Sequence, residues 1–182
     1  MALRTQIAPD DCIEQYEKAA GEHREIGFEM LALGSALGVE MLALSVEMVL
    51  KAAYFRLIGY APTRRIGTTD LRDAATDIQI LGVSHLAQGF HNLEFWAEGL
   101  ISLHKAGLPG RLRQGRSYAA VPAQPLPAVE ENNLRHCAAR LMTNWAIGDR
   151  YKSLEPYANK QDLTDVFDDA MTIIYLYDQG SI

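Results

Sequence analysis

Two oppositely charged residues lie one helical turn apart in the most apolar stretch of this sequence. Glu47 and Lys51 are four positions apart, with the acid on the N-terminal side, which is the favourable order for a helical ion pair. The surrounding residues 36–58 are apolar on nearly every side of a helix, which is typical of a buried helix. Because an unpaired charge is costly in a protein interior, we expect this pair to satisfy itself, or to face a groove or another subunit.

A histidine and two glutamates follow with helical spacing. His91, Glu94 and Glu98 occupy positions i, i+3 and i+7, so they share one helical face and offer one nitrogen and two oxygens to a metal. A carboxylate site in a helical bundle also needs Glu and Glu-x-x-His residues from other helices, and the chain contains no Glu-x-x-His. We therefore favour a solvated acidic face and predict no metal and no cofactor, with a metal-binding helical bundle kept as an alternative.

Several arginines outside these helices are candidates for binding an anion. Arg150 and Tyr151 lie between two predicted helices, where a guanidinium can bond helix carbonyls or bind an anion through two N–H groups. Five further arginines could form a patch that binds an anion. Charged loop residues are more often simply solvated, so this is the less favoured interpretation of the five. They are Arg64, Arg65, Arg111, Arg113 and Arg116.

The composition is that of a globular protein with one core. The chain has 182 residues, of which 48% are hydrophobic and 22% charged, and we treat residues 1–182 as one domain. A net charge of −6 argues against wrapping a nucleic-acid duplex by bulk attraction. Cys12 and Cys137 form neither a metal-binding spacing nor a disulfide framework, and no apolar run is long enough to span a membrane. We therefore expect a cytoplasmic protein that does not associate with membranes.

Apolar residues recur at helical spacing along the chain, and no alternating run of strand length occurs. This pattern predicts an all-α fold, an up-and-down bundle of about five main helices with residues 36–58 at its centre. The third of these helices allows an interruption around Gly82, after which it continues from Ser84 to His104. The predicted helices span 10–33, 36–58, 70–104, 130–147 and 160–178.

Caps and loops complete this outline. Asp10 or Asp11 is expected to cap the first helix and Asn159 the last, because short polar side chains accept hydrogen bonds from free helix N–H groups. Residues 107–129 contain four prolines and three glycines without a period, so we expect a long loop.

Three fragments, in this order, resemble the HEPN domain family. The first, at residues 45–62, reads SVEMVLKAAYFRLIGYAP and is similar to that family's central helix with its Glu-x-x-x-Lys pair. The second, at 89–96, reads GFHNLEFW and is similar to its Gly-His-Asp-Leu helix start. The third, at 148–178, reads GDRYKSLEPYANKQDLTDVFDDAMTIIYLYD and is similar to its Arg-Tyr element and acid-rich last helix.

The resemblance implies roles for individual residues. In HEPN domains the histidine corresponding to His91 helps to set helix packing, and here Asn92 replaces the aspartate, so we expect a charged His-Asp contact to be lost. HEPN ribonucleases cut RNA with an Arg and a His roughly four to six residues apart on a late helix. No histidine of this chain follows an arginine at that spacing, and Arg135 and His136 are adjacent. The resemblance therefore implies a member without the cleavage pair.

Our leading hypothesis is a non-catalytic HEPN-like module that binds a nucleotide, RNA or a partner protein, in a nucleotidyltransferase-associated or a defence or toxin–antitoxin system. A homodimer is expected from the resemblance, and because the apolar second and fourth helices would gain a surface to bury. The ligand-binding candidates are Glu47, Lys51, His91, Arg150 and Tyr151. The alternative from the enzyme class is a divergent HEPN-type nuclease or nucleotide-processing enzyme that uses the first four of these residues.

Overall fold

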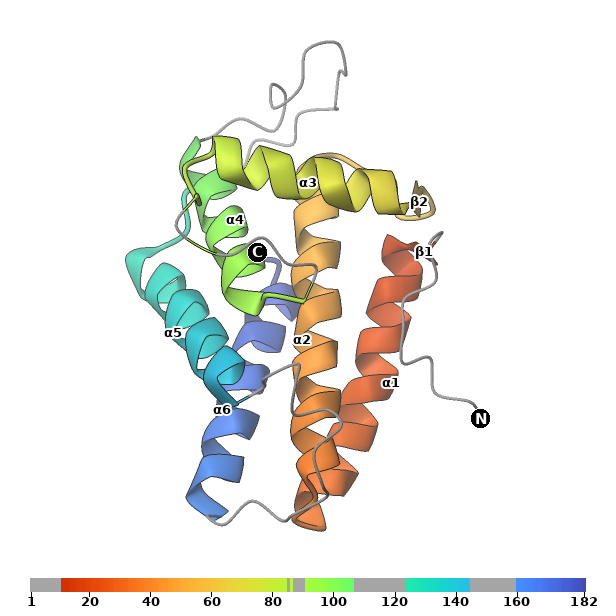
Figure 1. The fold of residues 1–182 in the computed structure, drawn as a ribbon, viewed down its shortest axis with the longest axis vertical. Coiled ribbons are helices and arrows are strands. Elements are labelled where there is room, and N and C mark those ends of the chain that lie inside the picture. The colour runs from red at the N-terminus through yellow and green to blue at the C-terminus, as the bar shows by residue number, and fades with distance from the viewer. Residues whose placement is uncertain (1–10, 85, 87–90, 107–123, 145–159) are drawn as a thin grey trace.

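The computed structural model describes residues 11–84, 86, 91–106, 124–144 and 160–182. In these segments the chain forms a helical bundle with one pair of two-residue strands, which confirms the all-α prediction (Figure 1). The helices are α1 (Ile13–Ala32), α2 (Ala36–Leu57), α3 (Thr68–Ile80), α4 (Leu93–Ala106), α5 (Ala128–Asn144) and α6 (Lys160–Asp178). The strands β1 (Asp11–Cys12) and β2 (Arg65–Ile66) are antiparallel, with Asp11 opposite Ile66.

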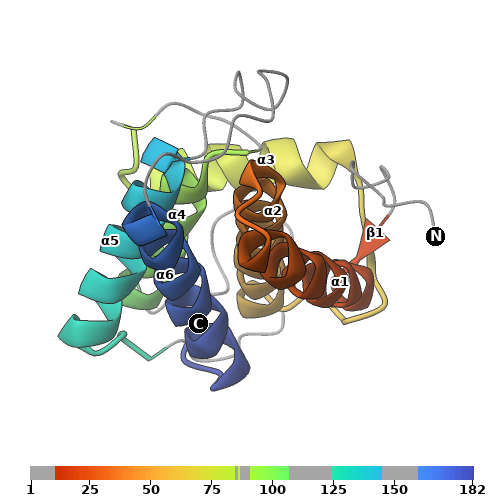
Figure 2. The same ribbon diagram turned by 90° about the horizontal axis from the view of Figure 1, so that it is seen from below.

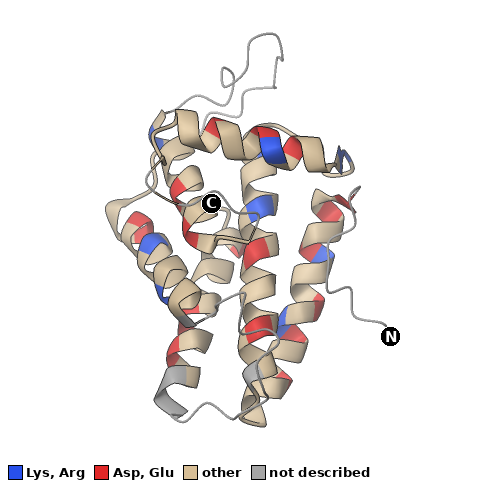
Figure 3. Cartoon of the chain, in the orientation of Figure 1, with Lys and Arg blue, Asp and Glu red and all other residues tan. Residues whose placement is uncertain are grey.

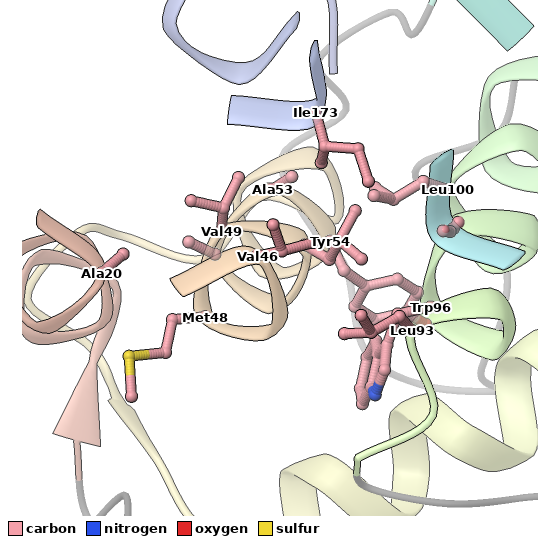
Figure 4. Close-up of a cluster of buried hydrophobic side chains, with 14 of the residues drawn as sticks. Ala20, Val46, Met48, Val49, Ala53, Tyr54, Leu93, Trp96, Leu100 and Ile173 are labelled. Atoms are coloured by element: carbon pink, nitrogen blue, oxygen red, sulfur yellow. The ribbon is translucent and has the colours of Figure 1, made fainter. Parts of the chain in front are cut away.

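Helix α2 is the centre of the bundle, as its all-round apolar character predicts. It packs against α1 on one side and against α4 and α6 on the other (Figures 1 and 2). Figure 4 shows the apolar cluster around α2, in which Tyr54 lies beside Trp96 of α4, and Ile173 of α6 lies beside Leu100 of α4. Burial of these side chains is the main driving force that holds α2 in place.

The apolar surface of α2 and most of that of α5 are covered within one chain. Helix α5 buries Leu134, Ala138 and Leu141 against its neighbours α4 and α6, and its exposed positions include the polar His136 and Arg140. In the described residues the fold itself covers most of this apolar surface, and the expected homodimer stays a prediction.

The predicted helix 70–104 is two helices rather than one. Helix α3 ends at Ile80, and Gly82 has a φ of +100°, a conformation that glycine adopts without strain. The N–H groups of Gly82 and Val83 donate to the carbonyls of Gln79 and Ile78, which closes the end of α3. The next helix begins at Leu93 and not at Ser84, as the continuation after Gly82 required.

Helix α3 also departs from the predicted up-and-down topology. Figure 1 shows it lying across the end of the bundle, transverse to α2. A local network fixes its start: Asp70 accepts hydrogen bonds from the backbone N–H of Gly67 at 2.9 Å and from the hydroxyl of Tyr60 at 2.7 Å. The bundle is therefore an up-and-down arrangement with one transverse helix.

The start of α1 differs from the predicted cap. Cys12 is the N-cap residue, and its backbone N–H donates to the side-chain oxygen of Gln15 at 3.0 Å. Asp11 lies one residue before the N-cap position, in β1 opposite Ile66, so it is not the cap of α1. Asp10 and Asn159, the other expected caps, lie outside the described residues.

Other predicted boundaries agree with the structure to within a few residues. Helix α2 ends one residue before the predicted position, and Gly59 follows it with a φ of +86°. Helix α5 begins two residues before the predicted position, so the expected loop 107–129 ends earlier, and its residues up to 123 lie outside the described segments. No helix in the described part of the chain has the length and apolar character needed to cross a membrane.

Candidate functional site

Glu47 and Lys51 form a buried ion pair on α2. The Lys51 Nζ lies 2.6 Å from Oε1 of Glu47, and each side chain is only 2% exposed. An ion pair removed from water in this way is stable only when its members satisfy one another, and breaking it would leave a buried charge. Glu47 and Lys51 thus satisfy each other's charge. This is the first of the three arrangements expected for the pair, before a groove or another subunit.

His91 closes over this pair from the turn before α4. Its Nδ1 lies 2.9 Å from Oε2 and 3.1 Å from Oε1 of Glu47, while its own side chain remains 47% exposed. Glu47 therefore accepts from Lys51 in the interior and contacts His91 at the surface. Two of the fragments that resemble HEPN motifs meet at this carboxylate.

Asn92 has a role that the sequence analysis did not predict. Its side-chain oxygen accepts a hydrogen bond from the backbone N–H of Phe95 at 3.1 Å, so Asn92 caps α4. An Asn directly before an apolar helical run is a start signal that could have predicted this. The acidic partner expected in the next position is absent, and Glu47 of α2 provides one for His91 instead.

Trp96 is the second residue that sequence reasoning did not select. Its ring is fully buried, and Lys51 Nζ lies 5.6 Å from the ring centroid, within the range of a cation–π interaction. Within the described segments Glu47 is the hydrogen-bond acceptor of Lys51. The aromatic face therefore shields the side of the ammonium that the carboxylate does not cover.

The charges around Glu47 determine its protonation. Burial alone would raise the pKa of its carboxyl, but Lys51 and then His91 outweigh this and hold the pKa below its usual value. Glu47 is therefore ionised at neutral pH and engaged on both oxygens. A carboxylate in this condition is a poor general base.

The metal-binding alternative finds no support in this geometry. His91 precedes the first residue of α4 and contacts Glu47, while Glu98 pairs with Arg135 of α5, so the expected helical face of His91, Glu94 and Glu98 is not assembled. Across the described residues, no group of three His, Cys, Asp or Glu side chains is placed to hold a metal ion.

Of the arginine candidates, the structure describes Arg64 and Arg65. The Arg64 guanidinium lies 3.6 Å from the ring centroid of Tyr60 and 3.5 Å from Asp70. Arg65 lies in β2 and is exposed, and the described segments contain no ion pair for it. Arg111, Arg113, Arg116, Arg150 and Tyr151 lie outside the described residues.

The buried thiol of Cys137 is not an activated nucleophile. Burial raises the pKa of Cys137 to about 11, with a further contribution from the charge of Asp169. Cys12 is half-buried at the N-cap of α1.

Comparison with models of protein families, with curated proteins and with solved structures found no match to this chain.

Proposed function

We propose that this chain is a non-catalytic binding module similar to HEPN domains, and that it binds a nucleotide or a short RNA through the phosphates. The observation that carries the non-catalytic part is the contact of Glu47 with both Lys51 and His91. These are the residues that a divergent nuclease would use, and here they bond to one another. A catalytic acid or base needs a free position toward its substrate.

The sequence fragments support the family part of the proposal. Glu47 of the Glu-x-x-x-Lys pair lies on α2 and His91 in the turn before α4, 44 positions away, yet they form one contact in the helical bundle. A shared structural centre of this kind is what the resemblance implies for those motifs. A homodimer, which the resemblance also implies, belongs to the proposal and is measured by light scattering of the purified protein.

Arg64 and Arg65 are the described residues best suited to a phosphate. Both side chains are exposed, and the stack on Tyr60 holds the Arg64 guanidinium in a fixed orientation. Figure 3 shows acidic and basic residues interspersed on the helices in this view. A local pair of arginines therefore suits a short or single-stranded ligand better than a duplex, which needs an extended basic surface.

The test is the change in melting temperature with a panel of nucleotides and short RNA oligomers, since a ligand that prefers the folded form stabilises it. We expect a rise with at least one of them, and we expect the double variant Arg64→Ala/Arg65→Ala to lose it. The control Lys18→Ala/Arg24→Ala removes the same charge from α1 and should keep the rise. Equal loss in both double variants would indicate unspecific attraction.

Two outcomes would overturn the proposal. No rise with any nucleotide or RNA, combined with a copurifying protein, would favour a protein partner. Cleavage of labelled RNA that disappears in His91→Ala at an unchanged melting temperature would favour the enzyme alternative.

A further inference from the structure

A pocket of about 540 Å³ opens between the C-terminal ends of α2, α4 and α6 and the segment that leads into α5. Its apolar lining includes Ala53 and Leu57 of α2, Leu126, and Ile182. A volume of this order is within the range of sites for small organic ligands. The apolar part of the walls favours a ligand with an apolar body.

Two residues of the pocket lining carry hydrogen-bond acceptors that have no partner within the described residues. His104 is 6% exposed, and its Nδ1 lies 2.6 Å from the carbonyl oxygen of Gln124. A carbonyl can only accept, so Nδ1 carries the hydrogen and Nε2 of the neutral ring is an acceptor. This Nε2 is buried, and no hydrogen-bond partner for it exists among the described residues. An unsatisfied buried polar atom is costly, so a ligand that donates to it gains binding free energy.

Glu130 is the second acceptor. It lies in the first turn of α5 and lines the pocket, and the described segments contain no ion pair or hydrogen bond for its carboxylate. Its neighbour Glu131 behaves differently, since it pairs with Lys105 at 2.6 Å and with Arg135 at 3.0 Å. Glu130 is thus the carboxylate of this turn that remains available to a ligand.

The remaining charge in the lining is already neutralised. Arg56 of α2 pairs with Glu17 of α1, and the same carboxylate accepts the hydroxyl of Tyr177. The guanidinium carbon of Arg56 lies 5.5 Å from the Tyr177 ring centroid. With Arg56 and Glu17 cancelling, Glu130 gives the pocket a net negative charge.

The geometry points to a binding site for a small organic amine in its protonated form. The ammonium donates to the carboxylate of Glu130 and, once the imidazole shifts enough to uncover its buried Nε2, to His104, and the apolar body lies against Leu57 and Leu126. An anionic ligand would face an uncompensated carboxylate, and a neutral one would leave that charge unpaired.

This site is separate from the buried ion pair. Arg56 follows Glu47 by nine residues, about two and a half helical turns, so the two project from opposite sides of α2. The amine site therefore goes beyond the proposed phosphate-binding role, and neither depends on the other.

Three ligands with the same indole body separate the head-group chemistries: tryptamine, the neutral tryptophol and the anionic indole-3-acetate. Titration calorimetry on the full chain at neutral pH should show binding of tryptamine, with the other two at least about tenfold weaker, the difference a lost charge-assisted hydrogen bond produces. Equal affinity for the three, or none for tryptamine, would overturn the inference.

The variants Glu130→Gln and Glu131→Gln form a matched pair in one helical turn. We expect the first to weaken tryptamine binding about tenfold or more and the second to leave it within about twofold. Equal weakening in both would show that only the general negative charge matters and would refute the assigned site. Tryptamine should also shift the ¹⁵N resonance of His104 Nε2, and an unchanged resonance would remove His104 from the site.

Discussion

Gly27 and Gly38 face each other where α1 packs against α2. A methyl group on Gly38 would lie 2.9 Å from the carbonyl oxygen of Gly27 and 2.6 Å from the backbone nitrogen of Leu31. Separations this short involve backbone atoms that cannot rotate away. The two glycines therefore allow the close approach of α1 to the central helix.

Substitution of Gly38 by alanine should lower the free energy of unfolding by about 1–3 kcal/mol, because overpacking outweighs the better helix propensity of alanine. The matched control is Gly21→Ala in α1, where a methyl group meets nothing within 4 Å. That variant should be stabilised by about 0.5–1 kcal/mol. Urea unfolding measures both, and a stabilised Gly38→Ala would contradict the close contact.

The buried pair predicts strongly non-additive substitutions. Glu47→Leu or Lys51→Met alone should cost about 3–5 kcal/mol, because each leaves one unpaired charge in the interior. The double variant should cost much less than the sum, because both charges are gone. Lys105→Met provides the surface comparison, with a side chain 57% exposed in its pair with Glu131 and an expected cost below about 1 kcal/mol. Additive losses in the double-mutant cycle would contradict the coupling.

The depressed pKa of Glu47 predicts how its contribution changes with pH. A carboxyl whose pKa is lower in the folded state than its ordinary value of 4.5 stabilises the fold above that value, and this contribution is lost as the pH falls through the folded pKa. The difference in unfolding free energy between the unmodified chain and Glu47→Gln should shrink as the pH falls below 4.5. A difference that grows in acid would contradict this sign.

Burial should protect Cys137 from thiol reagents. Its pKa of about 11 leaves little thiolate at pH 8, whereas Cys12 is only half-buried. With a chromogenic disulfide reagent we expect slow reaction of Cys137 in the native protein and fast reaction in denaturant. The variant Cys12→Ser isolates this thiol, and native reaction at the rate of a free cysteine would show that it is accessible.

The sequence by itself determined the helical class, the central position of residues 36–58 and the contact within the Glu47–Lys51 pair. These features depend on residues within one or two turns of each other, where spacing decides which side chains share a face. The stop after α2 is equally local, because Gly59 adopts a positive φ of 86°.

Only the tertiary structure decided where the helices cross and what they bring together. The contact of His91 with Glu47 joins residues 44 positions apart, and the transverse course of α3 depends on how Asp70 ties its first turn to Tyr60. Helical periodicity carries no information about turns and crossing angles. The physical reason is that such contacts form from packing between elements, and a side chain such as His91 reaches its partner only after both helices have docked.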